Sequence, residues 1–359
     1  MQHIAVFCKT LLKGGSEKQA LILTKLLSEE NKKVSLINWS KDKVDPEYSE
    51  FIKINSLSYF ALYGNGLQKY FQFIKIIREG GVSIILSYLT LPNFIAGISK
   101  IFLRKIVTIG GIRNEKLPYH KFLFERWTHN NLNNASIFNN YSAKNKFTKR
   151  GFKSDKVFVI HNAIENNHLI SSSGEARSDL RIVTVSRFVE QKDFTTALWS
   201  FKNLIDRNNI HTISYYIVGY GPMEKEIVSL AKDLNILDRI KFFINPTNIP
   251  EILKDCDIYL STSLYEGLSN SIMEAMVAGL PIVATDVGDN RYLIKDGYNG
   301  YLVPCKDIDM ITEKLAFLTE SEALRKKYGN FSKSRIRDKF SKGNLLVNYL
   351  KLFSEFQKA

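Results

Sequence analysis

The sequence has few of the residues that would indicate a disulfide or metal framework. Its three cysteines, Cys8, Cys256 and Cys305, are widely separated and show no paired spacing. The six histidines likewise show none of the spacings typical of metal ligands. Neither a disulfide-bonded scaffold nor a zinc ribbon is indicated, and we expect a reducing compartment and no metal site.

A run with the length and uniform apolar character of a membrane-spanning helix is also missing. The longest apolar stretch, VSIILSYLTLPNFIAGI at residues 82–98, is interrupted by Pro92, Asn93 and hydroxyl side chains. Because a buried strand followed by a buried helix explains it better, we expect no transmembrane segment. The N-terminal MQHIAVFCKT has no basic segment before its apolar run, which predicts a strand and not a signal peptide.

Two common nucleotide-binding patterns do not occur. Gly14 and Gly15 form a turn after the first predicted strand, but they lack the G-x-G-x-x-G spacing of dinucleotide-binding proteins. No G-x-x-x-x-G-K-[ST] motif occurs either. A nicotinamide enzyme and a P-loop nucleotidase are therefore not indicated, and we expect no cofactor.

Positive charge is concentrated in the first half of the 359-residue chain. Residues 1–170 contain 25 Lys and Arg against 12 Asp and Glu, whereas the remaining residues contain 25 against 24, for a net charge of +14. Charge that served only solubility would be spread more evenly. The asymmetry favours an anionic partner for the first half, such as a lipid surface, a phosphorylated acceptor or nucleic acid.

Short apolar runs alternate with longer amphipathic segments, which is typical of parallel sheets covered by helices on both faces. The alternation pauses at a polar stretch, residues 170–179, and then restarts. Together with the length, this predicts an α/β protein of two doubly wound, Rossmann-like domains facing one another across a cleft. The expected bounds are 1–170 for the first domain, 171–178 for a linker, 179–338 for the second domain and 339–359 for a terminal helix.

The most informative segment is YEGLSNSIMEAMVAGLPIVAT at residues 265–285. It reads as a loop, a helix that begins near Asn270 or Ser271, and a strand, and the helix start favours an anion. Glu266 precedes the helix and Glu274 lies about one turn inside it, where two carboxylates suit the vicinal hydroxyls of a sugar. Taken singly, Glu274 is better explained as a first-turn glutamate and Glu266 as a surface loop residue.

Two cations follow the first strand of the second domain. In TVSRFVEQKDF, Arg187 and Lys192 lie where a diphosphate in the cleft would need neutralising, and two fixed cations can stabilise a leaving diphosphate without a metal. A solvated loop is the alternative explanation. Gly219 and Gly221 follow a later strand and precede a helix, and they permit close backbone approach to a ligand.

Taken together, these segments resemble the family 4 retaining glycosyltransferases of the GT-B fold, of the bacterial surface-polysaccharide type. The resemblance covers most of the chain, and its most specific part is the E-x7-E unit EGLSNSIME. It also rests on the Gly14–Gly15 turn, IHNAIE at 160–165, VSRFVEQKD and VGYGPMEKEI. In that fold the terminal helix crosses back toward the first domain.

The resemblance implies a role for each matching residue. Arg187 and Lys192 would bind the donor diphosphate, Glu274 the ribose and Glu266 the transferred sugar, and Ile244 and Asn245 would lie near the base. No histidine aligns with the one that many relatives place near the sugar, and Arg113 is the candidate there. The predicted catalytic residues are Arg187, Lys192 and Glu266; the predicted donor-binding residues are Gly14, Gly15, Gly219, Asn245, Gly267, Leu268, Ser269, Asn270 and Glu274.

Such an enzyme would transfer a hexose or N-acetylhexosamine from a nucleotide sugar, by family likeness a uridine diphosphate sugar, without a metal. The acceptor would be a glycan or a polyprenyl-diphosphate-linked sugar. The basic first half suggests peripheral attachment to the inner face of the cytoplasmic membrane, with no nucleic-acid partner. The alternatives are a nucleotide-sugar epimerase of similar architecture and a non-catalytic polyanion-binding protein.

One predicted helix bears on the membrane hypothesis. In LQKYFQFIKIIREGG we expect Leu67, Tyr70, Phe71, Ile74 and Ile77 to face the core, with Lys69, Phe73 and Ile76 on another face. Exposed aromatic and lysine side chains together suit anionic headgroups. Packing of Phe73 and Ile76 against a neighbouring helix is the alternative.

Overall fold

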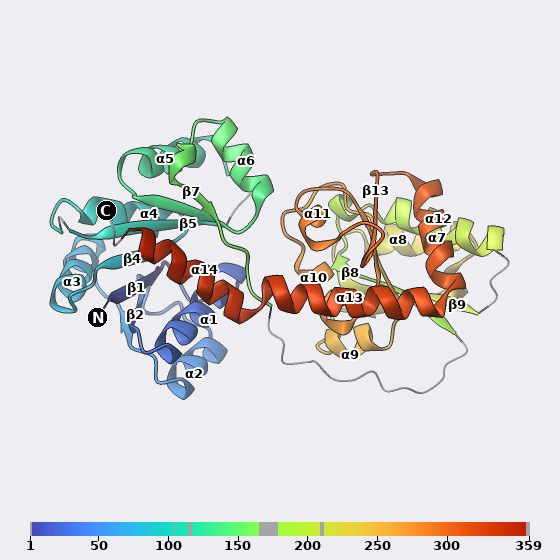
Figure 1. Cartoon of the computed structure of the whole chain (residues 1–359), viewed down its shortest axis with the longest axis horizontal. Coiled ribbons are helices and arrows are strands. Elements are labelled where there is room, and N and C mark those ends of the chain that lie inside the picture. Colours follow the sequence, from blue (N-terminus) through green and yellow to red (C-terminus); the bar gives the residue numbers. More distant parts are fainter. Residues whose placement is uncertain (1, 104, 114–116, 165–178, 209–211, 357–359) are drawn as a thin grey trace. The chain divides into compact units, whose positions relative to one another are not determined.

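The computed structural model describes residues 2–103, 105–113, 117–164, 179–208 and 212–356. Its contacts divide the chain into two compact units (Figure 1). Unit 1 contains Met1–Ala163 and Lys342–Ala359, and unit 2 contains Ile164–Ser341. The predicted linker at 171–178 lies outside the described residues. A cleft between the domains stays a prediction.

Unit 1 is built on a seven-stranded parallel sheet in the order β3-β2-β1-β4-β5-β6-β7. Each strand is followed by a helix, except the last, in the doubly wound pattern. The elements are β1 (His3–Cys8), α1 (Gly15–Glu29), β2 (Lys33–Asn38), α2 (Pro46–Ile54), β3 (Tyr59–Ala61), α3 (Gly66–Glu79), β4 (Ile84–Tyr88), α4 (Thr90–Ser99), β5 (Val107–Ile112), α5 (Tyr119–Asn131), β6 (Ala135–Phe138), α6 (Tyr141–Lys149), η1 (Ser154–Lys156), β7 (Val157–Val159) and α14 (Lys342–Glu355).

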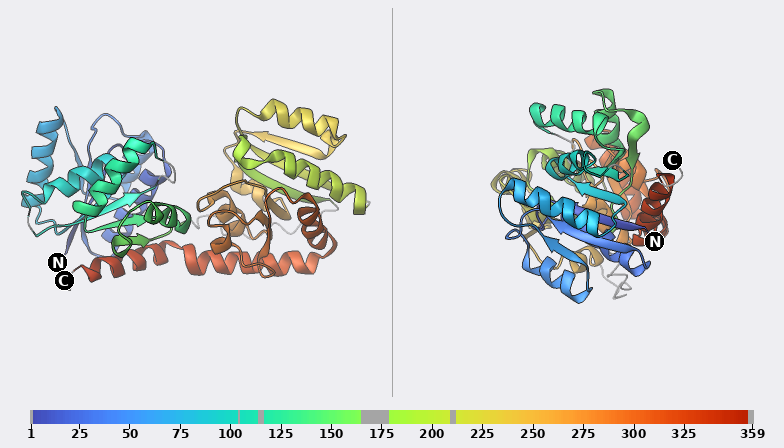
Figure 2. Two further views of the ribbon diagram at one scale, coloured as in Figure 1. Left: turned by 90° about the horizontal axis from the view of Figure 1, so that it is seen from above. Right: turned by 90° about the vertical axis from the view of Figure 1, so that its left-hand side faces the viewer.

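Unit 2 repeats the design with a six-stranded parallel sheet in the order β10-β9-β8-β11-β12-β13. Figure 2 shows its helices on both faces of the sheet. The elements are β8 (Leu180–Arg187), η2 (Glu190–Lys192), α7 (Phe194–Asn208), β9 (Ile213–Tyr220), α8 (Glu224–Asp233), η3 (Leu237–Arg239), β10 (Ile240–Ile244), α9 (Ile249–Lys254), β11 (Ile258–Ser261), α10 (Asn270–Ala278), β12 (Ile282–Thr285), α11 (Asn290–Leu293), β13 (Gly300–Val303), α12 (Ile308–Glu320) and α13 (Glu322–Phe340).

Alternate strand residues supply apolar cores on both faces of each sheet. In β1 every residue is buried; Ile4 and Val6 join the cluster under α1 and α14, whereas Ala5 and Phe7 join the cluster under α3 and α4. Burial on both faces explains the uninterrupted apolar runs of the sequence. The predicted α/β class with two parallel sheets is confirmed.

The strand β3 was not predicted from the sequence, because YFA is short and none of its residues is fully buried. The predicted core face of α3 was also partly wrong. Phe73 is fully buried, whereas Leu67 and Phe71 are 71% and 63% exposed. A stripe counted from Leu67 and one counted from Tyr70 both fit a period of 3.6 residues, so periodicity alone could not choose between them.

The terminal helix α14 packs on unit 1. Leu345, Tyr349 and Phe353 are buried in the same cluster as Ile4 and Val6 of the sheet. Within the described residues, no helix is both long and apolar enough to cross a bilayer.

Candidate functional site

Unit 2 contains a pocket of about 470 Å³ beyond the carboxyl ends of its strands. Loops after β8, β9, β10 and β11 and the start of α10 form its walls, which is where open parallel sheets bind ligands. It brings together nine predicted residues that are spread over 88 positions of the sequence. These nine are Arg187, Lys192, Gly219, Asn245, Glu266, Leu268, Ser269, Asn270 and Glu274.

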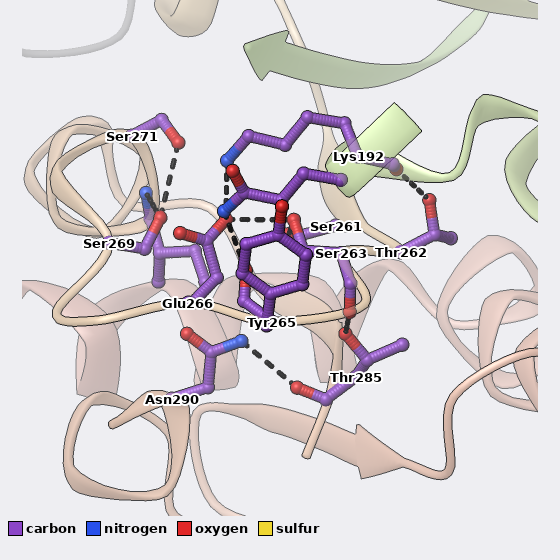
Figure 3. Close-up of polar contacts among 12 residues, drawn as sticks. Lys192, Ser261, Thr262, Ser263, Tyr265, Glu266, Ser269, Ser271, Thr285 and Asn290 are labelled. Carbon is purple, nitrogen blue, oxygen red and sulfur yellow. Dashed lines mark hydrogen bonds and ion pairs between the residues drawn. The ribbon is translucent and has the colours of Figure 1, made fainter. Parts of the chain in front are cut away.

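An ion pair joins two of the predicted catalytic residues. The Lys192 ammonium donates to Glu266 Oε1, and the Ser263 hydroxyl donates to the same oxygen at 2.8 Å (Figure 3). The side chains of Lys192 and Glu266 are only 14% and 9% exposed. Lys192 is therefore held at the pocket wall by a carboxylate 74 positions away in the sequence, and Glu266 is fixed from two sides.

The loop that carries Arg187 and Lys192 is fastened to the loop that carries Glu266. Thr262 Oγ1 donates to the carbonyl oxygens of Lys192 and Asp193, each at 2.9 Å. Gln191 Nε2 donates to Tyr265 O at 2.6 Å, and Leu264 N donates to Gln191 O at 2.8 Å. The two loops thus form one rigid support for the charged residues.

Further hydrogen bonds connect the Glu266 loop to β12 and α11. Thr285 Oγ1 donates to Ser263 O at 2.6 Å, and Asn290 Nδ2 donates to Thr285 O at 2.9 Å (Figure 3). Gly288 passes close beneath the loop with a φ of +54°, and a Cβ there would lie 1.9 Å from Glu266 O. Only glycine tolerates both the conformation and the close approach.

The start of α10 presents backbone amides to the pocket. Ser269 is the N-cap, with its hydroxyl accepting from Ile272 N at 3.5 Å. The helix therefore begins at Asn270, one of the two starts predicted for it, and its N-cap is Ser269. Glu274 is an exposed residue of the first turns and lines the same pocket. An anion at this end of the helix is stabilised by the free amides and the helix dipole.

The opposite wall comes from the ends of β9 and β10. At Gly219 a Cβ would lie 1.8 Å from Ser186 O, so the ends of β8 and β9 approach too closely for any other residue there. Asn245 has a φ of +48°, a conformation that asparagine tolerates better than most residues, and it lines the pocket. Ile244 is 46% exposed at the end of β10.

The remaining predicted residues are not among those that line this pocket of unit 2. Gly267 is in the Glu266 loop, and its carbonyl oxygen accepts a hydrogen bond from Asp289 N at 3.2 Å. Gly14 and Gly15 belong to unit 1, where they cap and begin α1. Arg113 is also in unit 1, and its guanidinium donates to Asn162 Oδ1 at 3.0 Å and to the Tyr349 hydroxyl at 3.1 Å. Arg113 therefore ties β5 to α14.

Sequence reasoning missed several residues of the pocket. Tyr220 lies between the two glycines of GYG and is 55% exposed at the pocket wall. The Ser186 hydroxyl also lines the pocket and is buried without a protein partner. Both immediately adjoin residues that were predicted, which is the signal that could have found them. The other missed residues are Val185, Gln191, Pro246, Ile249 and Ser271.

Two histidines of unit 1, His120 and His129, lie on α5. His129 is fully buried, bonded through Nδ1 to Ser136 Oγ at 2.8 Å, and burial lowers its pKa to about 4. His120 is exposed on α5. Among the described residues, no three His, Cys, Asp or Glu side chains are grouped closely enough to hold a metal ion.

Comparison with known proteins gives concordant results. Residues 166–335 match the family described as glycosyl transferases group 1. The chain is 28% identical over 221 residues to the poly(ribitol-phosphate) alpha-N-acetylglucosaminyltransferase of Staphylococcus aureus, a match that spans 61% of this chain and 41% of that enzyme. It is 24% identical over 369 residues, covering 100% of both chains, to a Campylobacter jejuni enzyme. That enzyme is named GalNAc-alpha-(1->4)-GalNAc-alpha-(1->3)-diNAcBac-PP-undecaprenol alpha-1,4-N-acetyl-D-galactosaminyltransferase.

A structural match extends over the whole chain. The crystal structure of Anabaena HepE in complex with UDP has a TM-score of 0.81 and covers 99% of this chain and 100% of its own. The identity is 16%, so this likeness shows the fold alone. The predicted GT-B fold is confirmed.

Proposed function

Because residues 166–335 belong to the glycosyl transferases group 1 family, we propose that the protein is a retaining, metal-independent glycosyltransferase of surface-polysaccharide synthesis. It transfers a hexose or N-acetylhexosamine from a nucleoside-diphosphate sugar to a glycan or lipid-linked sugar. The donor is uridine-linked. Support for uridine comes from the UDP that the structurally similar Anabaena protein binds.

One observation carries the proposal: a single pocket presents two cations, the N-terminus of a helix and two carboxylates. Arg187 and Lys192 neutralise the diphosphate, which the amides of α10 also contact. Glu274 accepts hydrogen bonds from the ribose hydroxyls. Glu266, held by Lys192 and Ser263, orients the transferred sugar beside the diphosphate.

In the reaction, the acceptor hydroxyl attacks the anomeric carbon from the face that the diphosphate leaves. A bond forms between the acceptor oxygen and the anomeric carbon, and the bond from that carbon to the β-phosphate oxygen breaks. The hydroxyl proton passes to the departing diphosphate. Glu266 is not a nucleophile in this scheme, and the bonds that its Oε1 accepts from Lys192 and Ser263 hold it in place to orient the sugar. Arg187 and Lys192 stabilise the charge that develops on the leaving group.

The acceptor is carried by a lipid at the inner face of the cytoplasmic membrane, and the protein attaches there peripherally. The Campylobacter relative is named for a substrate linked to undecaprenyl diphosphate. The excess of basic residues in the first 170 positions supports an anionic surface as the partner of unit 1.

The test is a panel of nucleotide sugars assayed with purified protein, with and without a chelator. We expect one uridine-linked donor to raise the melting temperature and to be hydrolysed slowly, with retained anomeric configuration by NMR and no effect of the chelator. Arg187→Ala should lower kcat/KM by about 100-fold or more. The matched control, Arg207→Ala, removes an exposed arginine of unit 2 that pairs with Asp309 outside the pocket. Inversion at the anomeric carbon, or equal activity of both variants, would refute the proposal.

A further inference from the structure

The helices α3, α4 and α5 form one outer layer of unit 1. Phe73 and Ile74 of α3 and Ile95 of α4 are buried together against Phe7 of the sheet. The next helix, α5, lies beside α4, where Asn93 Nδ2 donates to Glu125 Oε1 at 2.7 Å. The far side of this layer is turned to solvent, where polar and charged residues are the rule.

This outer side also carries a group of large apolar side chains. Helix α4, TLPNFIAGIS, contains no charged residue, and its Leu91 is exposed. Large apolar side chains on α3, after α4 and on α5 are exposed by 40% or more. We refer to these six as the apolar face: Leu67, Phe71, Ile101, Phe102, Phe124 and Trp127.

Two sets of ring contacts link residues of the apolar face to neighbouring segments. The ring of Tyr70 lies 6.2 Å from that of Phe71 and 6.1 Å from that of Phe102, which connects α3 to the segment after α4. The rings of Phe94 and Phe124 lie 4.9 Å apart, which connects α4 to α5. Aromatic residues of neighbouring segments therefore lie beside one another at two places, and a large exposed apolar patch is unusual unless something binds it.

Positive charge accompanies the apolar face. Residues 51–124, which contain α3, α4 and the start of α5, include ten Lys and Arg but only two Asp and Glu. Exposed Lys105 follows Phe102 by three positions, and exposed Lys121 lies one helical turn before Phe124. The Glu125 carboxylate is turned inward to Asn93, so it does not offset this charge at the surface.

We propose that the apolar face docks on an anionic lipid bilayer, with its aromatic and aliphatic side chains inserted at the headgroup level and its lysines on the lipid phosphates. Aromatic residues beside lysines are typical of membrane-interface segments. A second copy of this chain fits the surface less well, because a two-fold contact would oppose its excess positive charge to itself. The inference rests on the proposed function in so far as the acceptor there is membrane-bound.

The test is sedimentation of the full-length protein with vesicles of phosphatidylcholine alone or mixed with phosphatidylglycerol. The variant Phe71→Ser with Phe102→Ser changes two exposed residues of the apolar face. A matched control, Ile54→Ser with Val347→Ser, changes two apolar residues on α2 and α14 that are at least comparably exposed. These helices pack on the opposite face of the sheet.

We expect the wild type and the control to bind only the phosphatidylglycerol vesicles, and less as salt is added. The apolar-face variant should bind at least about tenfold more weakly. Equal binding of all three proteins, or none by the wild type, overturns the proposal. It is also overturned if ultracentrifugation without lipid shows a wild-type dimer that the variant loses, since a second copy then covers the face.

Calorimetric titration with UDP, on the same preparations without vesicles, separates this inference from the proposed function. All three proteins should bind UDP equally, because the pocket lies in unit 2 and the substitutions in unit 1. Failure of UDP binding in every preparation refutes the proposed function and leaves the vesicle result to decide the docking surface.

Discussion

The ion pair between Lys192 and Glu266 predicts a measurable coupling in the stability of unit 2. In Lys192→Met the Glu266 carboxylate keeps the Ser263 hydroxyl but loses its cation at a site only 9% exposed. Loss of a charged hydrogen bond to a buried carboxylate costs about 2 kcal/mol, on the order of 30-fold in the unfolding equilibrium. Replacing both residues, as Lys192→Met with Glu266→Gln, removes the unpaired charge. The double variant should be more stable than Lys192→Met by about 1 kcal/mol.

Tryptophan fluorescence can follow unit 2 alone. The chain has three tryptophans, of which Trp39 and Trp127 belong to unit 1 and Trp199 to unit 2. In a background of Trp39→Phe and Trp127→Phe, urea unfolding monitored through Trp199 reports the free energy of unfolding of unit 2. If the two single substitutions add to within about 0.5 kcal/mol in the double variant, the pair is not coupled and the reasoning is wrong.

Three further predictions concern single residues. Burial lowers the pKa of His129 from 6.5 to about 4. Because the unfolded chain therefore takes up the proton at a higher pH than the folded chain, the free energy of unfolding of unit 1 should fall by about 3 kcal/mol between pH 6.5 and pH 4. Urea unfolding of His129→Asn at both pH values should show a smaller loss, and an unchanged loss would contradict the assignment. Gly288→Ala places a Cβ 1.9 Å from Glu266 O. It should therefore lower the free energy of unfolding of unit 2 by about 2 kcal/mol and abolish thermal stabilisation by UDP. A variant that is as stable as the wild type and is still stabilised by UDP would show that the loop adapts. Glu274→Gln should leave stability within about 0.5 kcal/mol, yet calorimetry should show about tenfold weaker binding of UDP. Its affinity for 2′,3′-dideoxy-UDP should equal that of the wild type, and an equal loss for both ligands would rule out a ribose contact.

The fold was predictable from the sequence because both faces of each sheet are buried. Runs such as HIAVFC are apolar throughout because successive residues enter different cores, as Ile4 and Phe7 do. The half-exposed β3 lacks that signal. In α3 the composition permits two apolar stripes, and only packing against the sheet selects the one that buries Phe73.

The pocket was predictable to the extent that chemistry is tied to strand ends. Charged and glycine residues after parallel strands gather at one edge of a sheet, which is why Arg187, Gly219 and Glu266 meet. Pairing of Lys192 with Glu266 was not predictable, because it depends on how two loops 74 positions apart are fastened. Tyr220 was missed since an aromatic residue in a glycine turn has no fixed chemical role.

Calorimetric titration of the wild type and Arg187→Ala with UDP tests the central claim most directly. The account predicts one UDP bound per chain by the wild type and at least about tenfold weaker binding by Arg187→Ala, because the exposed guanidinium lines the pocket where the diphosphate lies. Equal affinity of the two proteins, or no binding of UDP by the wild type, would contradict the assignment of the pocket to a uridine-linked donor.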